Sequence, residues 1–258
     1  MTTEELFRDD ATLLACDATI TTLSDAGIEL DRTVFYPQGG GQAGDAGCLR
    51  RVDGAELALV DTRKGALPGQ ILHLVAPGTD LSGWAAGQAV TATLDAGRRM
   101  AHRRFHTATH LLCALVPHPV DGCSITAGYA RLDFHMTEPL DKGTLTAGIA
   151  RLVASAHPVQ QRWITEAELD AHPGLVRSMS VQPPRGQGRV RLIDIEGVDL
   201  QPCGGTHVAN TAEIGAVVVT KSIPPRPAGS CSALPSRHEK GPPGRALRAS
   251  SRAVQSLR

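Results

Sequence analysis

The sequence predicts an α+β protein in which a small N-terminal β-barrel domain precedes an α+β domain. Two observations predict this division. Short β-prone stretches separated by Gly, Pro and Asp fill residues 1–94, and apolar residues then recur at helical spacing from residue 95 onward. The chain has 258 residues, of which 41% are apolar and 20% charged, so it can bury one sizeable core or two modest ones.

The N-terminal domain, residues 1–94, is expected to contain only strands. The β-prone stretches are residues 18–23, 57–60, 71–75 and 89–94. Short strands at this spacing, with turn residues between them, are typical of a small barrel.

The second domain, residues 95–222, begins with a predicted amphipathic helix that Pro117 ends. A second helix is expected at residues 145–157. Strands are expected at residues 130–135, 189–195 and 215–220, where apolar and polar residues alternate or β-prone residues cluster. The mixture indicates an α+β domain.

The remaining stretch, residues 223–258, is an atypical tail that we expect to be disordered. Of its 36 residues 15 are Pro, Gly or Ser, and it has no apolar periodicity. It also carries six Arg and one Lys against a single Glu in a chain of net charge zero. No strongly basic domain remains when it is set aside, so contact with nucleic acid would depend on local clusters.

Two features predict a cytoplasmic protein that is not bound to a membrane. The first ten residues carry four acidic side chains in place of the basic start of an export signal, and no apolar run approaches the roughly 20 residues of a membrane-spanning helix. The six cysteines are widely scattered, so reduced thiols are expected.

Four residues predict a zinc site. His106 and His110 are four residues apart on the predicted helix, which places both imidazoles on one face. Cys203 and His207 are also four apart, but the glycines between them indicate a tight loop that can turn both side chains the same way. Three nitrogens and one sulfur suit tetrahedral Zn²⁺. His102, one turn earlier on the helix, is the rival ligand, and we assign it a supporting role.

The sequence lacks two common zinc motifs. No Glu follows His106, so the HExxH motif of metalloproteases is absent. Thr206 stands where the zinc deaminase pattern PCxxC needs its second cysteine, and His207 follows it. A hydrolase of another kind is therefore indicated, and a purely structural zinc stays open.

The paired motifs His106-Thr-Ala-Thr-His110 and Cys203-Gly-Gly-Thr-His207 resemble those of the alanyl-tRNA synthetase editing domain and of its free-standing relatives, the AlaX alanyl-tRNA editing proteins. The similarity extends over about residues 5–221. The Gly-rich stretch from Phe35 to Asp45 is similar to that of the longer AlaX members, which carry an extra N-terminal β-barrel domain.

This resemblance implies a zinc-dependent hydrolase that removes a wrongly attached amino acid from tRNA(Ala), chiefly serine, with glycine as a further candidate, and that needs no nucleotide cofactor. A pocket that selects a small side chain discriminates by only about 1–3 kcal/mol, so a second site is needed to correct errors. Two alternatives stay open: a deacylase of another aminoacyl-tRNA, such as the threonyl type, and an inactive tRNA-binding module with structural zinc.

The resemblance places Thr109 and Ser124 near the substrate, where they would bind the serine hydroxyl, with Thr126 as the alternative to Ser124. A threonine in a helix otherwise bonds its own preceding carbonyl. The Gly-rich loop is expected to approach the pocket through five residues, unless it only stabilises the barrel: Gln38, Gly40, Gly41, Gln42 and Asp45. Gly39, Gly41 and Gly44 match GxGxxG, but no helix pattern follows, so a dinucleotide site is not expected.

Clustered arginines are the candidates for contact with tRNA phosphates, although they could equally form a solvated face. They flank the zinc helix and follow it on the second-domain strands: Arg98, Arg99, Arg103, Arg104, Arg185, Arg189 and Arg191. After Lys221 the two closing strands of the family are not recognisable. The sheet beside the metal is therefore expected to lack an edge.

Overall fold

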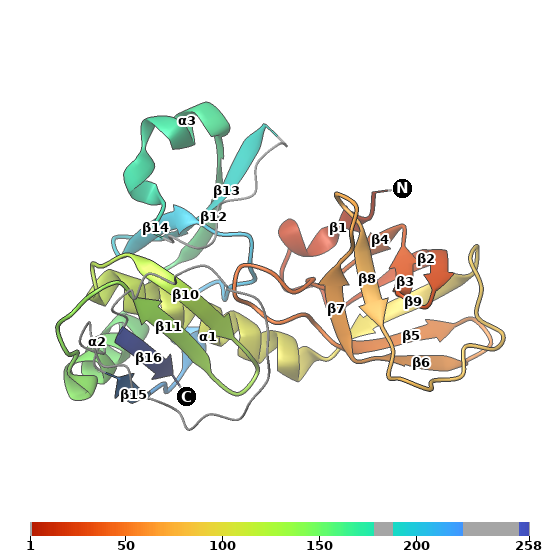
Figure 1. The fold of residues 1–258 in the computed structure, drawn as a ribbon, viewed down its shortest axis with the longest axis horizontal. Helices are drawn as coiled ribbons and strands as arrows, with labels where there is room; N and C mark the ends of the chain where they lie inside the picture. The colour runs from red at the N-terminus through yellow and green to blue at the C-terminus, as the bar shows by residue number, and fades with distance from the viewer. Residues whose placement is uncertain (1, 178–187, 224–252, 258) are drawn as a thin grey trace, which may run out of the picture.

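The computed structural model describes residues 2–177, 188–223 and 253–257. It consists of a β-rich N-terminal domain and a mixed α/β domain, and the long helix α1 (Ala96–Leu115) runs from the first into the second (Figure 1). The predicted α+β class and the order of the two domains are confirmed. Within the described residues, no helix is long and apolar enough to cross a membrane.

The N-terminal domain contains one seven-stranded sheet, with the strand order β6-β5-β9-β2-β3-β8-β7, and one short parallel pair, β1 with β4. The strands are β1 (Glu4–Glu5), β2 (Ala15–Ser24), β3 (Gly27–Leu30), β4 (Arg32–Thr33), β5 (Gly47–Arg51), β6 (Glu56–Leu59), β7 (Asp61–Lys64), β8 (Ile71–Leu74) and β9 (Ala89–Leu94), with a 3-10 turn at Leu6–Arg8. The four β-prone stretches fall on β2, β6, β8 and β9.

The seven strands curl around one core. The first part of β2 pairs with β9 and the second part with β3, so β2 joins two halves of the sheet. The two outermost strands, β6 and β7, are consecutive in the chain and separated only by Val60. The ends of the sheet therefore lie side by side, and the side chains of Ile20, Ile28, Leu30 and Leu49 are buried inside.

The second domain holds two sheets and two longer helices. The strand orders are β10-β11-β16-β15 and β12-β13-β14. The elements after α1 are β10 (Val120–Ile125), β11 (Ala130–Phe134), α2 (Lys142–Ala154), β12 (Val159–Thr165), α3 (Glu166–Ala171), β13 (Arg189–Ile195), β14 (Asp199–Pro202), β15 (Val219–Ile223) and β16 (Ala253–Leu257), with 3-10 turns at Pro173–Leu175 and Thr211–Ile214.

Helix α1 is fixed at both ends and along one side. The Asp95 side chain accepts a hydrogen bond from the Arg98 N–H at 2.9 Å, which satisfies a free donor of the first turn. Pro117 follows the last turn, as predicted. Helix α2 packs against α1 at Gly148, where a Cβ would lie 2.8 Å from Leu115 Cδ1. The glycine therefore allows the close approach of the two helices.

The expectation of a tail with no strand is corrected at one segment. Ala253–Leu257 forms β16, which lies antiparallel between β11 and β15 and completes a four-stranded sheet. Leu257 is 1% exposed and belongs to the core of the domain. A segment of this composition can form a strand because the two neighbouring strands, β11 and β15, supply its hydrogen bonds. The disorder expected for residues 224–252 lies outside the described residues.

The two domains are joined by a buried ion pair. Arg99 Nη2 lies 2.5 Å from Asp45 Oδ2, and each residue is 1% exposed. The guanidinium also donates to the carbonyls of Ala11 at 2.9 Å and Val34 at 2.6 Å. The Asp45 carboxylate in turn accepts from the Tyr36 N–H at 2.8 Å. Helix α1 is thereby fastened to the N-terminal domain.

Candidate metal centre

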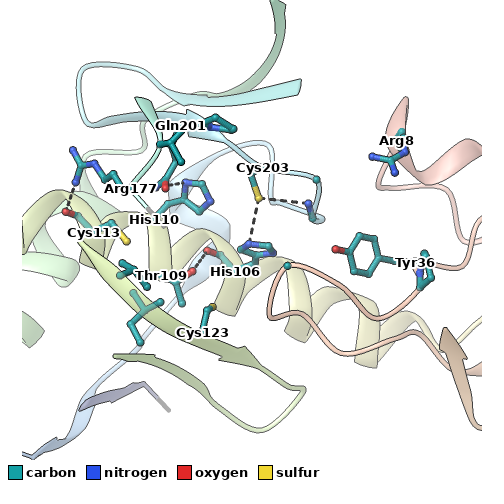
Figure 2. Close-up of a pocket in the computed structure, with 18 of the residues that line it drawn as sticks. Arg8, Tyr36, His106, Thr109, His110, Cys113, Cys123, Arg177, Gln201 and Cys203 are labelled. Carbon is teal, nitrogen blue, oxygen red and sulfur yellow. Dashed lines mark hydrogen bonds between the residues drawn. The ribbon is translucent and has the colours of Figure 1, made fainter. Parts of the chain in front are cut away.

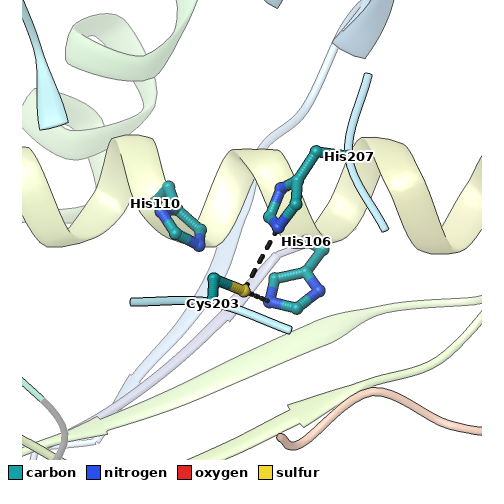
Figure 3. Close-up of side chains that lie close together, drawn as sticks. All are labelled: His106, His110, Cys203 and His207. Carbon is teal, nitrogen blue, oxygen red and sulfur yellow. Dashed lines mark hydrogen bonds between the residues drawn. The ribbon is translucent and has the colours of Figure 1, made fainter. Parts of the chain in front are cut away.

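The four predicted ligands converge. The ligand atoms of His106, His110, Cys203 and His207 all lie within 4.8 Å of one another. Cys203 Sγ is 3.4 Å from His106 Nε2 and 3.2 Å from His207 Nε2. Figure 3 shows His106 and His110 extending from neighbouring turns of α1 while Cys203 and His207 approach from the loop after β14. This group could hold a metal ion.

Each imidazole is held through Nδ1. The partners are Gln42 Oε1 at 2.8 Å for His106, Asp199 Oδ2 at 2.8 Å for His110, and Thr107 Oγ1 at 3.2 Å for His207. The hydroxyl of Thr107 itself donates to the Arg103 carbonyl, so its oxygen accepts the histidine proton. These bonds place hydrogen on Nδ1 and leave Nε2 facing Cys203. A histidine binds a metal through a nitrogen that carries no proton, so Nε2 of His110 must be deprotonated when an ion binds.

Loop residues 203–207 are ordered by the side chains around them. Arg191 Nη1 donates to the carbonyls of Cys203 at 3.1 Å and Gly205 at 2.8 Å, and Arg103 Nε donates to the His207 carbonyl at 2.7 Å. A Cβ at Gly205 would lie 2.1 Å from His106 Cε1. The position therefore requires glycine, because any side chain would displace the imidazole.

The electrostatics of the group favour the thiolate. Burial alone would raise the pKa of the Cys203 thiol, but the imidazoles of His106 and His207 outweigh it, and the pKa lies well below its usual range. Burial also lowers the pKa of His207. For His110 the penalty of burial is overcome by the bond to Asp199 and the nearness of Cys203, which raise its pKa to about 10.

These donors fit zinc. A thiolate and three neutral imidazole nitrogens form a common tetrahedral set for Zn²⁺, and the carboxylate on His110 is the usual support for a zinc-bound histidine. His102, the rival ligand, lies outside the group. It is fully buried, and its Nδ1 is 3.5 Å from Asp45 Oδ1.

The four side chains border a cleft of about 170 Å³ between the two domains (Figure 2). The cleft is lined by residues of both domains: Phe7, Arg8, Tyr36, Pro37, Gly40, Lys64, His106, Thr109, His110, Cys113, Val120, Cys123, Leu132, Val176, Arg177, Gln201, Pro202, Cys203, Gly204 and Gly205. A small molecule or the end of a polymer can therefore reach the metal-binding group.

The two residues expected to bind the serine hydroxyl lie differently. Thr109 lines the cleft, and its hydroxyl donates to the His106 carbonyl at 2.6 Å. Ser124 is not among the lining residues, whereas its neighbour Cys123 is, because successive side chains of β10 point to opposite sides. The alternative, Thr126, is half-buried, lies outside the lining too, and its hydroxyl donates to the Tyr129 carbonyl at 3.0 Å.

The Gly-rich loop reaches the metal-binding group. Gly41 and Ala43 exchange backbone hydrogen bonds with Ile125 of β10, at 2.8 and 2.9 Å. Gln42, between them, is fully buried, and its side-chain oxygen contacts His106 Nδ1 and the Thr206 backbone N–H. Gln42 therefore holds the ring of His106 on the side away from Cys203.

The other loop residues have separate positions. Gly40 lines the cleft with φ +58°, and Gly41 packs so closely on Cys123 that a Cβ would lie 2.8 Å from its sulfur. Gln38 is exposed and does not line the cleft. Asp45 is buried in the ion pair with Arg99, which corrects the expectation that it binds substrate.

The arginines of α1 contact main-chain carbonyls of the protein. Arg98 bonds Gly44 at 2.8 and 3.0 Å, and Arg104 bonds Ile214 at 2.6 Å. Arg99 and Arg103 are 1% and 7% exposed, so both are enclosed by the fold. Their guanidinium groups donate to carbonyls of the segments around the helix, and the expected contact of the cluster with tRNA stays a prediction.

The described arginines of the second cluster, Arg189 and Arg191, lie in different surroundings. Arg189 covers the ring of Trp163 at 4.4 Å, on the surface of β13, while Arg191 is 8% exposed and orders the metal-binding loop. Arg185 lies outside the described residues. The supporting contacts of Asp199, Arg191 and Cys123 were not assigned from the sequence. For Asp199 the available signal is its place in the stretch Val198-Asp-Leu-Gln-Pro-Cys203, four residues before the predicted ligand Cys203.

Comparison with known proteins identifies the class. The family model described as the threonyl and alanyl tRNA synthetase second additional domain matches residues 190–241, which include the loop with Cys203 and His207. The fold and site therefore define a protein that carries this second additional domain behind an N-terminal β-rich domain.

Full-length relatives narrow the class to a family. The chain is 33% identical over 230 residues to the alanyl-tRNA editing protein AlaX-M of Methanosarcina acetivorans, covering 85% of this chain and 93% of that protein. It is 30% identical over 231 residues to AlaX-M of Saccharolobus solfataricus, covering 85% and 92%. Alanine–tRNA ligase of Methanothrix thermoacetophila is 32% identical over 215 residues, which are 80% of this chain and 22% of the ligase. The chain belongs to the AlaX-M family of alanyl-tRNA editing proteins.

Proposed function

We propose that this protein hydrolyses the ester bond between a wrongly attached amino acid and tRNA(Ala), with serine as the main substrate and glycine as the second, and that it does so with zinc. One observation carries the proposal: three Nε2 atoms and a thiolate converge beside a cleft that both domains line. The names of the relatives support the choice of tRNA(Ala). When bound, Zn²⁺ would supply a Lewis acid that polarises the ester carbonyl or lowers the pKa of a water.

The chain's own residues divide the remaining work. His106, His110, Cys203 and His207 hold the ion, and Gln42, Asp199 and Thr107 keep their rings in place. Thr109 faces the cleft with its hydrogen committed to the His106 carbonyl, so its oxygen is left as an acceptor. The hydroxyl of serine can donate to that oxygen, and alanine has no group that could. This difference would let the site hydrolyse the serine ester faster than the alanine ester, which is the correct product.

The arrangement of the donors also supports a second candidate. Four protein ligands close a tetrahedral site, which is typical of a structural metal. A module that binds tRNA without hydrolysis would keep the same four residues. The threonyl editing type stays open for the same site because the matching family model covers both synthetases.

A single experiment separates the candidates. Deacylation of Ser-, Gly- and Ala-tRNA(Ala) and of Ser-tRNA(Thr) is measured together with the zinc content of the same preparation. We expect one zinc per chain, rapid release of serine from tRNA(Ala) and little release of alanine. The variants His106→Ala and Cys203→Ala should lose both zinc and turnover, while Cys48→Ala, outside the cleft, should keep both. Turnover that survives without zinc would contradict the mechanism.

The role of Thr109 has its own test. In Thr109→Val the acceptor oxygen is replaced by a methyl group of similar size. We expect a drop in kcat/KM for Ser-tRNA(Ala) of about tenfold, since one hydrogen bond to a desolvated hydroxyl is lost, and a smaller change for Gly-tRNA(Ala). Equal losses for the two substrates would remove Thr109 from recognition of the side chain.

A further inference from the structure

The cleft has two chemically different ends. The inner end lies inside the second domain, and its lining side chains are small or apolar and 3–5% exposed: Thr109, Cys113, Val120 and Leu132, with Cys123 beside them. The outer end is formed by the N-terminal domain, and its lining side chains are aromatic or cationic: Phe7, Arg8, Tyr36 and Lys64, with Pro37. In Figure 2, Arg8 and Tyr36 lie on one side of His106 and Cys203, and Thr109, Cys113 and Cys123 lie on the other.

We infer that the outer end of the cleft holds the terminal adenosine of the tRNA and its 5′ phosphate, and that the amino acid occupies the inner end. The inference rests on the proposed function, because it assumes an aminoacyl ester at the metal-binding group. The proposed function already places the amino-acid side chain at Thr109, and the inference adds the position of the nucleotide. The chemistry of each end supports this direction.

The inner end fits an amino acid better than a nucleotide. Its side chains are buried, and its charged member, Arg177, is engaged by the protein: Nη1 donates to the Cys113 carbonyl at 2.5 Å, and Nη2 lies 3.9 Å from Asp199 Oδ1. A phosphate placed there would compete with the carboxylate that orients His110. A side chain as small as that of serine places no such charge at this end.

The outer end has the positive charge that a phosphate needs. Lys64 is exposed on β7, and a Cβ at Gly39 would lie 3.3 Å from its Cε, so its stem lies along the Gly-rich loop toward the cleft. Arg8 adds a guanidinium, paired with Glu5 through Nε. Among the described residues that line the cleft, none is a carboxylate. The ammonium of Lys64, in a lining without carboxylates, therefore favours the nucleic-acid backbone, and Arg8, whose charge Glu5 offsets in part, adds less.

Two aromatic side chains also form part of the wall at the outer end: Phe7, which is 2% exposed, and Tyr36, which is 6% exposed. The Tyr36 hydroxyl donates to the Gly39 carbonyl at 2.8 Å, and the Phe7 ring packs edge-on against Tyr36 with centroids 5.4 Å apart. The Tyr36 ring is therefore fixed in orientation, and the part of it that borders the cleft offers a base an apolar contact that does not depend on sequence. The metal ligands lie between the two ends, where the ester would be.

The direction is tested by photocrosslinking. The probe is the trinucleotide CCA with 8-azidoadenosine at its 3′ end and serine attached through a non-hydrolysable amide, bound to the zinc-loaded full chain. We expect adducts on peptides that contain residues 6–8, 36–40 or 61–64. Adducts confined to residues 109–132 or 176–177 would place the adenosine at the inner end and overturn the inference. This readout needs no substitution in the cleft.

A pair of variants on β7 supplies the second test. Lys64→Ala should weaken binding of the same probe by about fivefold and reduce its salt dependence by about one charge. Arg63→Ala is the matched control, because Arg63 is the neighbouring exposed cation, pairs with Asp61 at 2.9 Å and does not line the cleft. Equal effects of the two substitutions would contradict a specific phosphate contact.

Failure of the inference and failure of the proposed function give different results. Turnover of Ser-tRNA(Ala) by the wild-type protein is measured in the same preparation. Turnover together with inner-end adducts would overturn only the direction of the substrate. Adducts at the outer end without turnover would retain the nucleotide site and contradict the hydrolase.

Discussion

The two halves of the metal-binding group reach the same point by different means. His106 and His110 are positioned by the backbone hydrogen bonds of α1, so their spacing alone brings their imidazoles together. Cys203 and His207 lie in a loop that makes no repeating hydrogen bonds. Side chains from elsewhere hold it, chiefly Arg191. The helix half is thus prepared by local structure and the loop half by tertiary contacts.

This difference predicts that the loop half is the more vulnerable one. A substitution that disturbs the supports of the loop should displace two ligands at once. A substitution that removes the partner of a helix histidine should loosen one ring and leave its backbone in place. Three substitutions test this order, from the largest expected effect to the smallest.

Gly205→Ala should have the largest effect. The new methyl group would lie 2.1 Å from His106 Cε1, so either the loop or the imidazole must move. A shift of this size predicts a loss in kcat/KM on the order of 100-fold, together with reduced zinc content. Gly128→Ala is the matched control, because a Cβ there would meet nothing within 4 Å. Unchanged zinc content in Gly205→Ala would show that the loop half adapts.

Arg191→Met should follow. The methionine keeps the length of the side chain but leaves the carbonyls of Cys203 and Gly205 without their donor. We expect zinc affinity to fall by about 30-fold, measured by competition with a chelator, and the loop to become sensitive to proteases. Arg189→Met controls for the loss of charge on the same strand, since Arg189 covers Trp163 instead. Equal affinities in the two variants would contradict the role of Arg191.

Asp199→Asn should have the smallest effect of the three. The amide oxygen can still accept the Nδ1 proton of His110, although it lacks the charge that raises the pKa of that imidazole. A loss in zinc affinity of about tenfold is expected in the same competition assay. Asp194→Asn, which removes a carboxylate paired with Arg162 at 2.6 Å, serves as the control. If Asp199→Asn proved worse than Arg191→Met, the proposed order of the two halves would be reversed.

The same contrast explains how much of the site could be predicted from the sequence. A four-residue spacing specifies the face of a helix, and the double glycine indicated a loop, so all four members of the metal-binding group were predicted. Their partners come from distant segments: Gln42 is 64 residues from His106, and Asp199 is 89 residues from His110. No local period marks such pairs, and only similarity to a family drew attention to these segments.

Two positions could not be predicted, for physical reasons. The family resemblance placed Ser124 near the substrate, but its neighbour Cys123 lines the cleft, because a strand exposes alternate residues and the register of β10 shifts between Val120 and Gly122. Arg99 was a candidate for tRNA contact because clustered arginines suit phosphate. It pairs with the buried Asp45, and the sequence gives no local sign of a partner 54 residues away.

The secondary structure could be predicted where a local sequence pattern specifies it. It could not be predicted where pairing with neighbouring strands determines it. Helix α1 and strand β13 follow from apolar periodicity. Strand β16 has little periodicity of its own, and it is a strand because β11 and β15 offer it hydrogen bonds on both sides. In the N-terminal domain the strand β5 was overlooked, since residues 47–51 contain a glycine and two arginines that are poor strand formers.

The ion pair between Arg99 and Asp45 has a consequence for the width of the cleft. Separating the two domains would break this pair and the bonds from the Arg99 guanidinium to the carbonyls of Ala11 and Val34, at a cost in free energy. A hinge that opened and closed the cleft would have to meet that cost in every cycle. We therefore expect the two walls to keep a fixed width, so that the proposed substrate would have to fit the cleft as it arrives.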